Sequence, residues 1–157
     1  MTDFVYTSYL KTTPEELWHA LTDSDLIQRY WGVALISDWQ VGSTVDWVVG
    51  GIILADPEQV ILAADPLHTL SFTWHSITEE FGRAIQADPE ELAVMAAEDR
   101  SMATFELTPM TGIVKLTLTH SGFAEGSALR AGISEGWPAI LSNLKTFLET
   151  GQLLPFE

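Results

Sequence analysis

Cysteine is absent from the 157-residue sequence, and long apolar segments are absent as well. Without cysteine the chain forms no disulfide, no cysteine-ligated zinc site and no thiol nucleophile, which fits a reducing compartment. No uncharged apolar run approaches the roughly 18 to 20 residues that a membrane-spanning helix needs. The first residues include Asp3 and lack the basic segment that opens a secretory signal. We therefore expect a cytoplasmic protein without membrane contact.

Basic residues are scarce, with 7 Lys and Arg against 22 Asp and Glu, and the formal net charge is -15. A chain this acidic repels polyphosphate and anionic surfaces, so we expect no nucleic-acid partner. The acidity favours a role in solubility, or in tolerance of salt or acid, over a docking surface for a basic partner. The length fits a single domain, residues 1–157, that buries about 70% of the surface exposed by its unfolded chain.

Motifs for metal binding, cofactor binding and nucleophilic catalysis are also missing. The histidines include no H-x-x-x-H pair, and no carboxylates recur at a ligand interval. The sequence has no G-x-S-x-G nucleophile motif and no glycine-rich phosphate loop. We therefore expect no metal, no cofactor and no catalytic residue. If His75 and His120 lie together at one end of the predicted sheet, a general base or a metal site becomes possible there.

Two short helices are predicted directly after an opening strand over residues 4–10. In TTPEELWHAL, Thr13 is a candidate N-cap and Pro14 stands at the first helical position, with the acidic residue of a capping box close behind. A second helix begins in TDSDLIQRYW, where Thr22 or Asp23 can serve as the cap.

From Gly42 onward, apolar and polar residues alternate with the period of a β-strand. Four segments each place their apolar residues on one face: Val45, Trp47 and Val49; Leu70, Phe72 and Trp74; Ala103, Phe105 and Leu107; Val114, Leu116 and Leu118. Turn signals separate these segments, which predicts an antiparallel meander with one apolar and one wet face. The segment ADPEELAVMAAEDR interrupts the pattern and predicts a short helical insertion near residues 88–98.

The last segment, SEGWPAILSNLKTFLETG, predicts a long amphipathic helix over residues 134–151. On a helical wheel, Trp137 and the apolar residues that follow it cover an arc of roughly 120°. A proline inside a helix costs roughly 3 kcal/mol. Pro138 lies near the start of this helix, on the solvent flank of the arc. We expect a kink near residues 134–138 that directs Trp137 between helix and sheet. Gly136 lies on the other flank, where a missing side chain would admit a strand or lid element.

The order of strand, two short helices, meander and long C-terminal helix resembles the helix-grip fold of the START-like (SRPBCC) superfamily. Within it, the family named after the activator of the heat-shock-90 ATPase is similar in PEELWHALTDSDLIQRYW, VILAADPLHTLSFTWH, SMATFELTP and GWPAILSNLKTFLETG. The resemblance covers nearly the whole chain. It implies an α+β fold in which a curved antiparallel sheet of about six or seven strands wraps around the C-terminal helix.

The resemblance also implies a ligand cavity between the sheet and the last helix. It implies no single activity, because the superfamily includes transporters, cyclases and hydroxylase subunits. Eukaryotic cochaperones of the family carry a further N-terminal domain that supplies much of the contact with the chaperone. This chain begins at the first strand of the helix-grip domain, so we expect a single-domain homologue for which a chaperone partner is a weaker alternative.

Large apolar residues on the predicted inward faces are the candidate ligand-binding residues. They would line a cavity between the sheet and the last helix: Trp31, Trp47, Phe72, Trp74, Phe105, Leu116, Trp137 and Leu141. Large rings also fill cores, so a filled core is the alternative. The set contains no charged residue, so such a cavity would select a flat or aliphatic, mainly uncharged ligand.

Three functions follow from these features. The favoured one is binding of a small hydrophobic ligand, with the acidic helix near residues 88–99 and the two short helices as rim or lid. The second is a cyclase- or hydrolase-like enzyme in which His75, His120 or Tyr30 moves protons in the same cavity. The third is a cochaperone-like role through an exposed surface, which the family name connects with the stress response. A homodimer stays open in each case.

Overall fold

The chain opens with the strand and helix pair that its capping residues predict. The computed structural model describes residues 3–156, beginning with β1 (Phe4–Leu10), α1 (Pro14–Thr22) and α2 (Ser24–Trp31). The Thr13 hydroxyl caps α1 by accepting a hydrogen bond from the Glu16 backbone N–H at 3.1 Å. Asp23 caps α2 in the same way, through the Leu26 N–H at 2.9 Å. The predicted caps of both helices are therefore confirmed.

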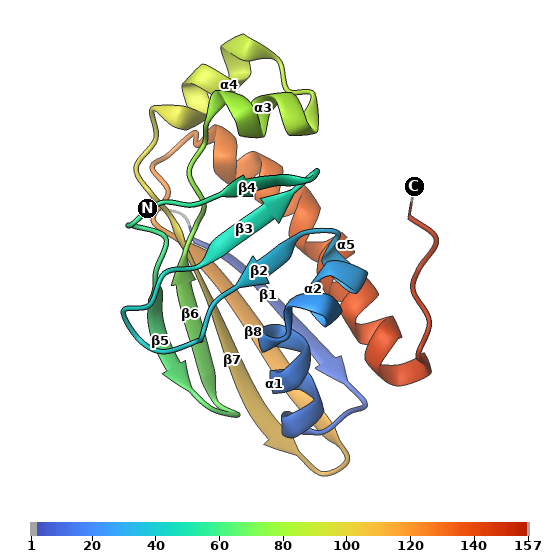
Figure 1. Cartoon of the computed structure of the whole chain (residues 1–157). Coiled ribbons are helices and arrows are strands. Elements are labelled where there is room, and N and C mark those ends of the chain that lie inside the picture. Colours follow the sequence, from blue (N-terminus) through green and yellow to red (C-terminus); the bar gives the residue numbers. More distant parts are fainter. Residues whose placement is uncertain (1–2, 157) are drawn as a thin grey trace.

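Within residues 3–156, eight strands form two antiparallel sheets, and Figure 1 labels their strands. The larger sheet has the order β1-β8-β7-β6-β5, where β5 to β8 are Ile61–Asp65, Thr69–Thr73, Met102–Met110 and Ile113–Ser121. The smaller sheet has the order β2-β3-β4, with the bounds Ala34–Ile36, Asp46–Val49 and Ile52–Leu54. An isolated bridge between Thr44 and Val60 connects the segments that lead into β3 and β5.

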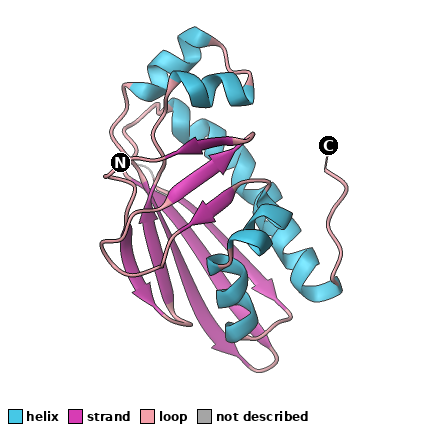
Figure 2. Ribbon diagram, in the orientation of Figure 1, coloured by secondary structure: helices cyan, strands magenta, loops and turns pink. Residues whose placement is uncertain are grey.

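The predicted α+β helix-grip fold is confirmed, whereas the arrangement of its strands differs from the expectation of one sheet with about six or seven strands. Figure 2 shows both helices and strands in the structure, and the paired strands of both sheets are antiparallel, as in an α+β fold. Strands β2 and β4, which the alternating pattern did not predict, have three residues each. A strand this short shows too little alternation to be recognised, because a period of two needs several repeats.

The core lies on the inward faces that the alternating pattern predicts. In β8, alternate residues from Val114 to His120 are buried. The register of β7 against β8 pairs Ala103 with His120 and Phe105 with Leu118, which aligns the apolar faces of the two strands. Helix α5 (Ala128–Thr150) packs against β1, α2 and α4. The sheet and α5 thus bury their apolar faces against one core.

Helix α5 begins six residues earlier than the predicted start at residue 134, at Ala128. The Ser127 hydroxyl caps it by accepting from the Arg130 N–H, and Gly151 ends it in the left-handed conformation, as predicted. The early turns contain Gly132, which lowers helix propensity and hides the true start in the sequence. No helix within residues 3–156 is long and apolar enough to reach across a lipid bilayer.

Because α5 begins early, Pro138 lies in its interior and not near its start. Pro138 has no N–H for the Ser134 carbonyl, and the Ser134 hydroxyl donates to the Arg130 carbonyl at 2.6 Å, a pattern that bends helices. The predicted kink stays a prediction. The expectation for Gly136 is wrong, because a Cβ atom there would meet nothing within 4 Å. That flank of α5 faces open space, with no strand or lid element against it.

The insertion is a pair of helices and not the single helix predicted. It consists of α3 (Glu79–Ile85) and α4 (Pro89–Ala96), and Figure 1 shows the pair beyond the end of the sheet, near β4 and the start of α5. Asp88 caps α4, as predicted. Helix α3 has its own cap, Thr78, but Gly82 at its centre weakens the helical pattern in the sequence. A Cβ atom at Gly82 would meet the end of the Leu92 side chain of α4, which would have to shift.

Candidate functional site

Six aromatic residues from distant parts of the chain form one packed group, here called the aromatic cluster: Trp31, Trp47, Phe72, Trp74, Phe105 and Trp137. The ring centroids of Trp47 and Trp74 are 4.8 Å apart. Those of Trp31 and Trp137 are 5.0 Å apart. The two aliphatic candidates, Leu116 and Leu141, are buried in the same core. The structure thus brings all eight candidate residues together, and their role as ligand contacts stays a prediction.

His120 is buried against this cluster and held at both ring nitrogens. The Trp137 indole donates from Nε1 to His120 Nδ1 at 3.0 Å. Indole nitrogen only donates, so Nδ1 is the acceptor and Nε2 carries the proton in the neutral ring. Nε2 then donates to Ser101 Oγ, at 2.8 Å. Because His120 donates to Ser101, it does not act as a base toward that hydroxyl.

Burial keeps His120 neutral. It lowers the pKa of the imidazole from 6.5 to about 3, and the nearby His75 lowers it further. The structure arranges the contact through strand register, since His120 lies in β8 and Ser101 directly precedes β7. His120 therefore acts as a polar connection between α5 and the sheet.

His75 is the second buried imidazole and has one ring nitrogen free. Its Nδ1 lies 2.8 Å from the Ser76 carbonyl oxygen, which only accepts, so Nδ1 carries the proton. Nε2 is then an acceptor, and it has no hydrogen-bond partner among residues 3–156. Burial lowers the pKa of His75 to about 4, so the ring is neutral near pH 7. The ring contacts Trp47, Trp74 and Phe81, with centroid distances of 4.8, 5.5 and 4.4 Å.

The two histidines lie at the same end of the sheet, as the sequence suggested, with Trp74 in contact with both. The Trp74 centroid is 4.6 Å from that of His120 and 5.5 Å from that of His75. In the part of the chain that the structure describes, no group of three or more His, Asp or Glu side chains is placed to hold a metal ion. The arrangement offers one neutral acceptor, His75 Nε2, beside aromatic rings.

A pocket of about 380 Å³, here called the histidine pocket, opens beside His75. Its lining comes from a residue before β5, the segment after β6, the end of α4 with the segment that follows it, and the start of α5: Glu58, Trp74, His75, Ser76, Ile77, Met95, Ala96, Glu98, Asp99, Arg100, Ser101 and Leu129. Trp74 belongs to both the pocket and the aromatic cluster. The histidine pocket is thus an opening at the edge of the cluster.

Arg100 organises one wall of the histidine pocket. Its guanidinium donates to the Trp74 carbonyl at 2.6 Å and lies 3.5 Å from an Asp56 carboxylate oxygen and 3.8 Å from one of Glu58. The pKa of Asp56 is lowered by hydrogen bonds from the Glu58 N–H and the Ser76 hydroxyl, with a further contribution from Arg100. The positive charge is therefore matched by carboxylates.

Glu98 joins the end of the helical insertion to the start of α5. One carboxylate oxygen accepts from the Ala128 and Leu129 N–H groups at 3.0 and 3.1 Å, and the other accepts from the Ser127 hydroxyl. A carboxylate at a helix N-terminus satisfies free N–H groups and complements the helix dipole. Glu98 therefore anchors α4 across the rim of the histidine pocket.

The Trp47 indole is the one buried side-chain group in residues 3–156 that lacks a hydrogen-bond partner at its nitrogen, Nε1. The side chain is 1% exposed. By contrast, the buried Gln59 amide pairs fully, with the Val45 and Leu54 carbonyls and the Ser76 N–H. An unpaired buried donor is unusual, because leaving one costs about 1 to 3 kcal/mol. Trp47 Nε1 thus stands out within the cluster.

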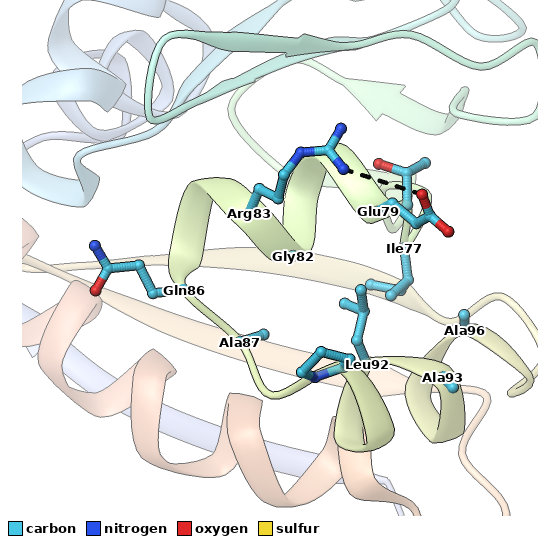
Figure 3. Close-up of a pocket in the computed structure, with 11 residues that line it drawn as sticks. Ile77, Glu79, Gly82, Arg83, Gln86, Ala87, Leu92, Ala93 and Ala96 are labelled. Atoms are coloured by element: carbon cyan, nitrogen blue, oxygen red, sulfur yellow. Dashed lines mark ion pairs between the residues drawn. The ribbon is translucent and has the colours of Figure 1, made fainter.

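A larger pocket, about 650 Å³, lies within the α3–α4 pair and not between the sheet and α5. Figure 3 shows Ile77 and Leu92 side by side on one side of it, with Arg83 and Glu79 above. Arg83 and Glu79 form an ion pair across one turn of α3, at 4.0 Å. The pocket's lining comes entirely from residues 77–96, so it belongs to the insertion alone.

Sequence reasoning missed Ser101, Arg100, Glu98 and Gln59, whose roles depend on contacts between distant segments. Arg100 carried the one usable signal, because only 7 residues of the chain are basic and this one ends a strongly acidic stretch. Ser101 and Gln59 resemble ordinary strand-flanking polar residues in the sequence. Only strand pairing reveals that they are buried.

Comparison with known proteins gives two kinds of match. Residues 11–149 match the family model described as "Activator of Hsp90 ATPase homolog 1-like protein". None of the curated proteins compared with the chain matches it. The crystal structure of MLL2253 from Mesorhizobium loti is similar with a TM-score of 0.74 and 27% identity, over 97% of this chain and 100% of that one.

Two further structures share the fold at lower identity. The Aha1 dimer from Colwellia psychrerythraea has a TM-score of 0.71 and 22% identity, over 97% of this chain and 99% of that one. CalU16 from Micromonospora echinospora has a TM-score of 0.67 and 19% identity, over 98% of this chain and 77% of that one. Since the family model spans most of the chain, this protein belongs to the Activator of Hsp90 ATPase homolog 1-like family.

Proposed function

We propose that this protein binds a small, mainly apolar molecule at the aromatic cluster, with the histidine pocket as its entrance. The observation that carries the proposal is the buried Trp47 indole N–H, which has no partner in an otherwise well-paired core. Trp74 supports it, because this residue is part of both the cluster and the pocket wall. A ligand in contact with both would lie between the sheet and α5, as the resemblance to the helix-grip fold implies.

The surroundings favour an uncharged, ring-containing ligand. The cluster has four tryptophan and two phenylalanine rings, and its tilted and edge contacts are the geometry in which aromatic rings attract one another. Flat apolar molecules can replace such contacts at little cost, whereas a charged group would lose its hydration. The candidate lining residues predicted from the sequence are therefore retained as the proposed ligand contacts.

The test is titration with a neutral fluorescent hydrophobic probe, N-phenyl-1-naphthylamine. We expect saturable binding near one probe per chain, and weaker binding to the Trp47→Phe variant. Trp18→Phe is the matched control, because Trp18 is half-buried in α1 and makes no ring contact with the cluster. Absence of saturable uptake by the folded protein, or equal loss in both variants, would count against this site.

Proton-transfer catalysis has less support than binding. His120 is occupied at both ring nitrogens, and the Tyr30 hydroxyl donates to the Ala20 carbonyl at 3.0 Å. Burial raises the pKa of Tyr30 well above its usual value of 10.0, so it does not ionise near neutral pH. Of the three residues considered from the sequence, only His75 keeps a free acceptor. A cyclase- or hydrolase-like role would therefore depend on that single group.

The partner hypotheses rest on similarity alone. The Colwellia protein was solved as a dimer, and a homodimer of this chain is proposed on that likeness. Light scattering after size-exclusion chromatography would then give twice the 17.3 kDa chain mass. A chaperone partner is suggested only by the family description, and a pull-down from native extract that fails to enrich the chaperone would remove it.

A further inference from the structure

Two side chains whose rings contact each other, Trp47 and His75, carry unpaired hydrogen-bonding groups of opposite kind. Trp47 Nε1 is a donor without an acceptor. His75 Nε2 is an acceptor without a donor among residues 3–156. The two side chains are 1% and 8% exposed, and their ring centroids are 4.8 Å apart. Both side chains are thus nearly buried and in direct contact.

A hydroxyl group matches this pair, because its oxygen accepts one hydrogen bond while its proton donates another. An ether or a carboxylate offers only acceptors, so it would leave His75 Nε2 unpaired. An ammonium offers only donors and would leave Trp47 Nε1 unpaired. The geometry points to a neutral aromatic alcohol or phenol as the ligand class, its hydroxyl bound between Trp47 Nε1 and His75 Nε2. This inference rests on the proposed binding function.

The charges around the pocket agree with a neutral head group. Glu58, Glu98 and Asp99 line the histidine pocket together with one basic residue, Arg100. Arg100 is already paired with the carboxylates of Asp56 and Glu58. An anionic head group would therefore meet uncompensated negative charge at the entrance. His75 itself is neutral near pH 7 and attracts no anion, since burial lowers its pKa to about 4.

Helix α3 covers this position. Phe81 of α3 packs on the His75 ring with a centroid distance of 4.4 Å. The same helix contacts β3 and β4. It is followed by α4 and then by Glu98, whose carboxylate accepts a hydrogen bond from the start of α5. Helix α3 therefore covers one side of the His75 ring, while the histidine pocket opens beside the same residue.

The experiment compares probes that share one ring system: 2-naphthol, 2-methoxynaphthalene and 2-naphthoate. Dissociation constants are measured by isothermal titration calorimetry on the full chain. We expect 2-naphthol to bind about tenfold more tightly than the methyl ether, since its hydroxyl donates to His75 Nε2 and the ether has no proton to donate. The carboxylate should bind most weakly.

Two variants assign this preference to the named atoms. His75→Leu should reduce the preference of 2-naphthol over its ether to less than about threefold, because it removes the acceptor that only the hydroxyl uses. Trp47→Phe should weaken both probes and leave the preference in place, because both oxygens accept from the Trp47 indole. Trp18→Phe should leave the preference unchanged, and circular dichroism establishes that each variant is folded.

The outcomes separate the two proposals. Equal affinity of naphthol and ether for the unsubstituted protein overturns the hydroxyl inference and leaves the binding function intact; this comparison needs no variant to fold. A naphthol preference that persists in the folded His75→Leu variant also overturns it. Absence of saturable binding by either neutral probe removes the binding function itself.

Discussion

At the scale of single residues, the two buried histidines make the stability of the fold depend on pH. Burial lowers the pKa of His120 to about 3 and that of His75 to about 4, against 6.5 in the unfolded chain. The folded protein therefore binds fewer protons than the unfolded chain once the pH falls below 6.5. Stability that is complete above this pH is lost progressively as the pH falls toward the folded-state pKa values.

We predict that the free energy of unfolding decreases by about 3 kcal/mol between pH 6.5 and 5. Each neutral imidazole contributes about half of that loss. Urea denaturation at several pH values, followed by tryptophan fluorescence, measures the slope.

The control for this prediction is His120→Gln, which keeps an acceptor for the Trp137 indole and a donor for Ser101 but does not titrate. Its slope should be about half that of the unsubstituted protein. An unchanged slope would show that His120 is not a source of the pH dependence.

At the scale of elements, the long helix α5 depends on a residue outside it. Glu98 accepts two backbone N–H groups and the Ser127 hydroxyl at the helix start, so it acts as a distant cap. We predict that Glu98→Ala lowers the free energy of unfolding by about 1 to 2 kcal/mol. Chemical denaturation measures the change, and the loosened α3–α4 pair should be cut faster by protease.

Glu90→Ala is the matched control for Glu98→Ala. Glu90 is an exposed carboxylate in the first turn of α4 and accepts no hydrogen bond from α5. We expect it to change stability by less than about 0.5 kcal/mol. A similar loss in both variants would mean that overall charge, and not the cap on α5, determines the effect.

The proline inside α5 sets a second test at this scale. Pro138 leaves the Ser134 carbonyl without its usual donor, while Trp137 next to it is held by His120. We predict that Pro138→Ala is neutral or raises the free energy of unfolding, by at most about 3 kcal/mol, because it restores a backbone hydrogen bond. Thermal and urea unfolding measure it. A clear loss of stability would instead show that the bend is needed for core packing.

At the scale of the whole molecule, the formal charge of -15 is a source of repulsion within the fold. Raising the salt concentration from 10 mM to 300 mM shortens the screening length from about 30 Å to about 6 Å. We predict that the melting temperature rises by a few degrees over this range, with sucrose as the uncharged control. A fall would mean that ion pairs such as Arg100–Asp56 outweigh the repulsion.

How far the sequence predicts this molecule depends on whether the signal is local. The alternation in β8 and the caps Thr13, Asp23 and Asp88 are local, and the structure confirms them. The start of α5 was misplaced because its cap, Ser127, is reinforced by Glu98 from another segment. Helix α3 was missed because Gly82, which packs against the Leu92 side chain, weakens its pattern.

The sequence by itself determined the family, the fold class and the apolar faces, because periodicity, capping residues and motif order are properties of neighbouring residues. It also supplied the tryptophans and histidines of the candidate site. Only the tertiary structure decided which nitrogens are occupied: His120 is held by Trp137 and Ser101, while His75 Nε2 and Trp47 Nε1 remain unpaired. Strand register and the packing of α3 decide this, and no local pattern encodes them.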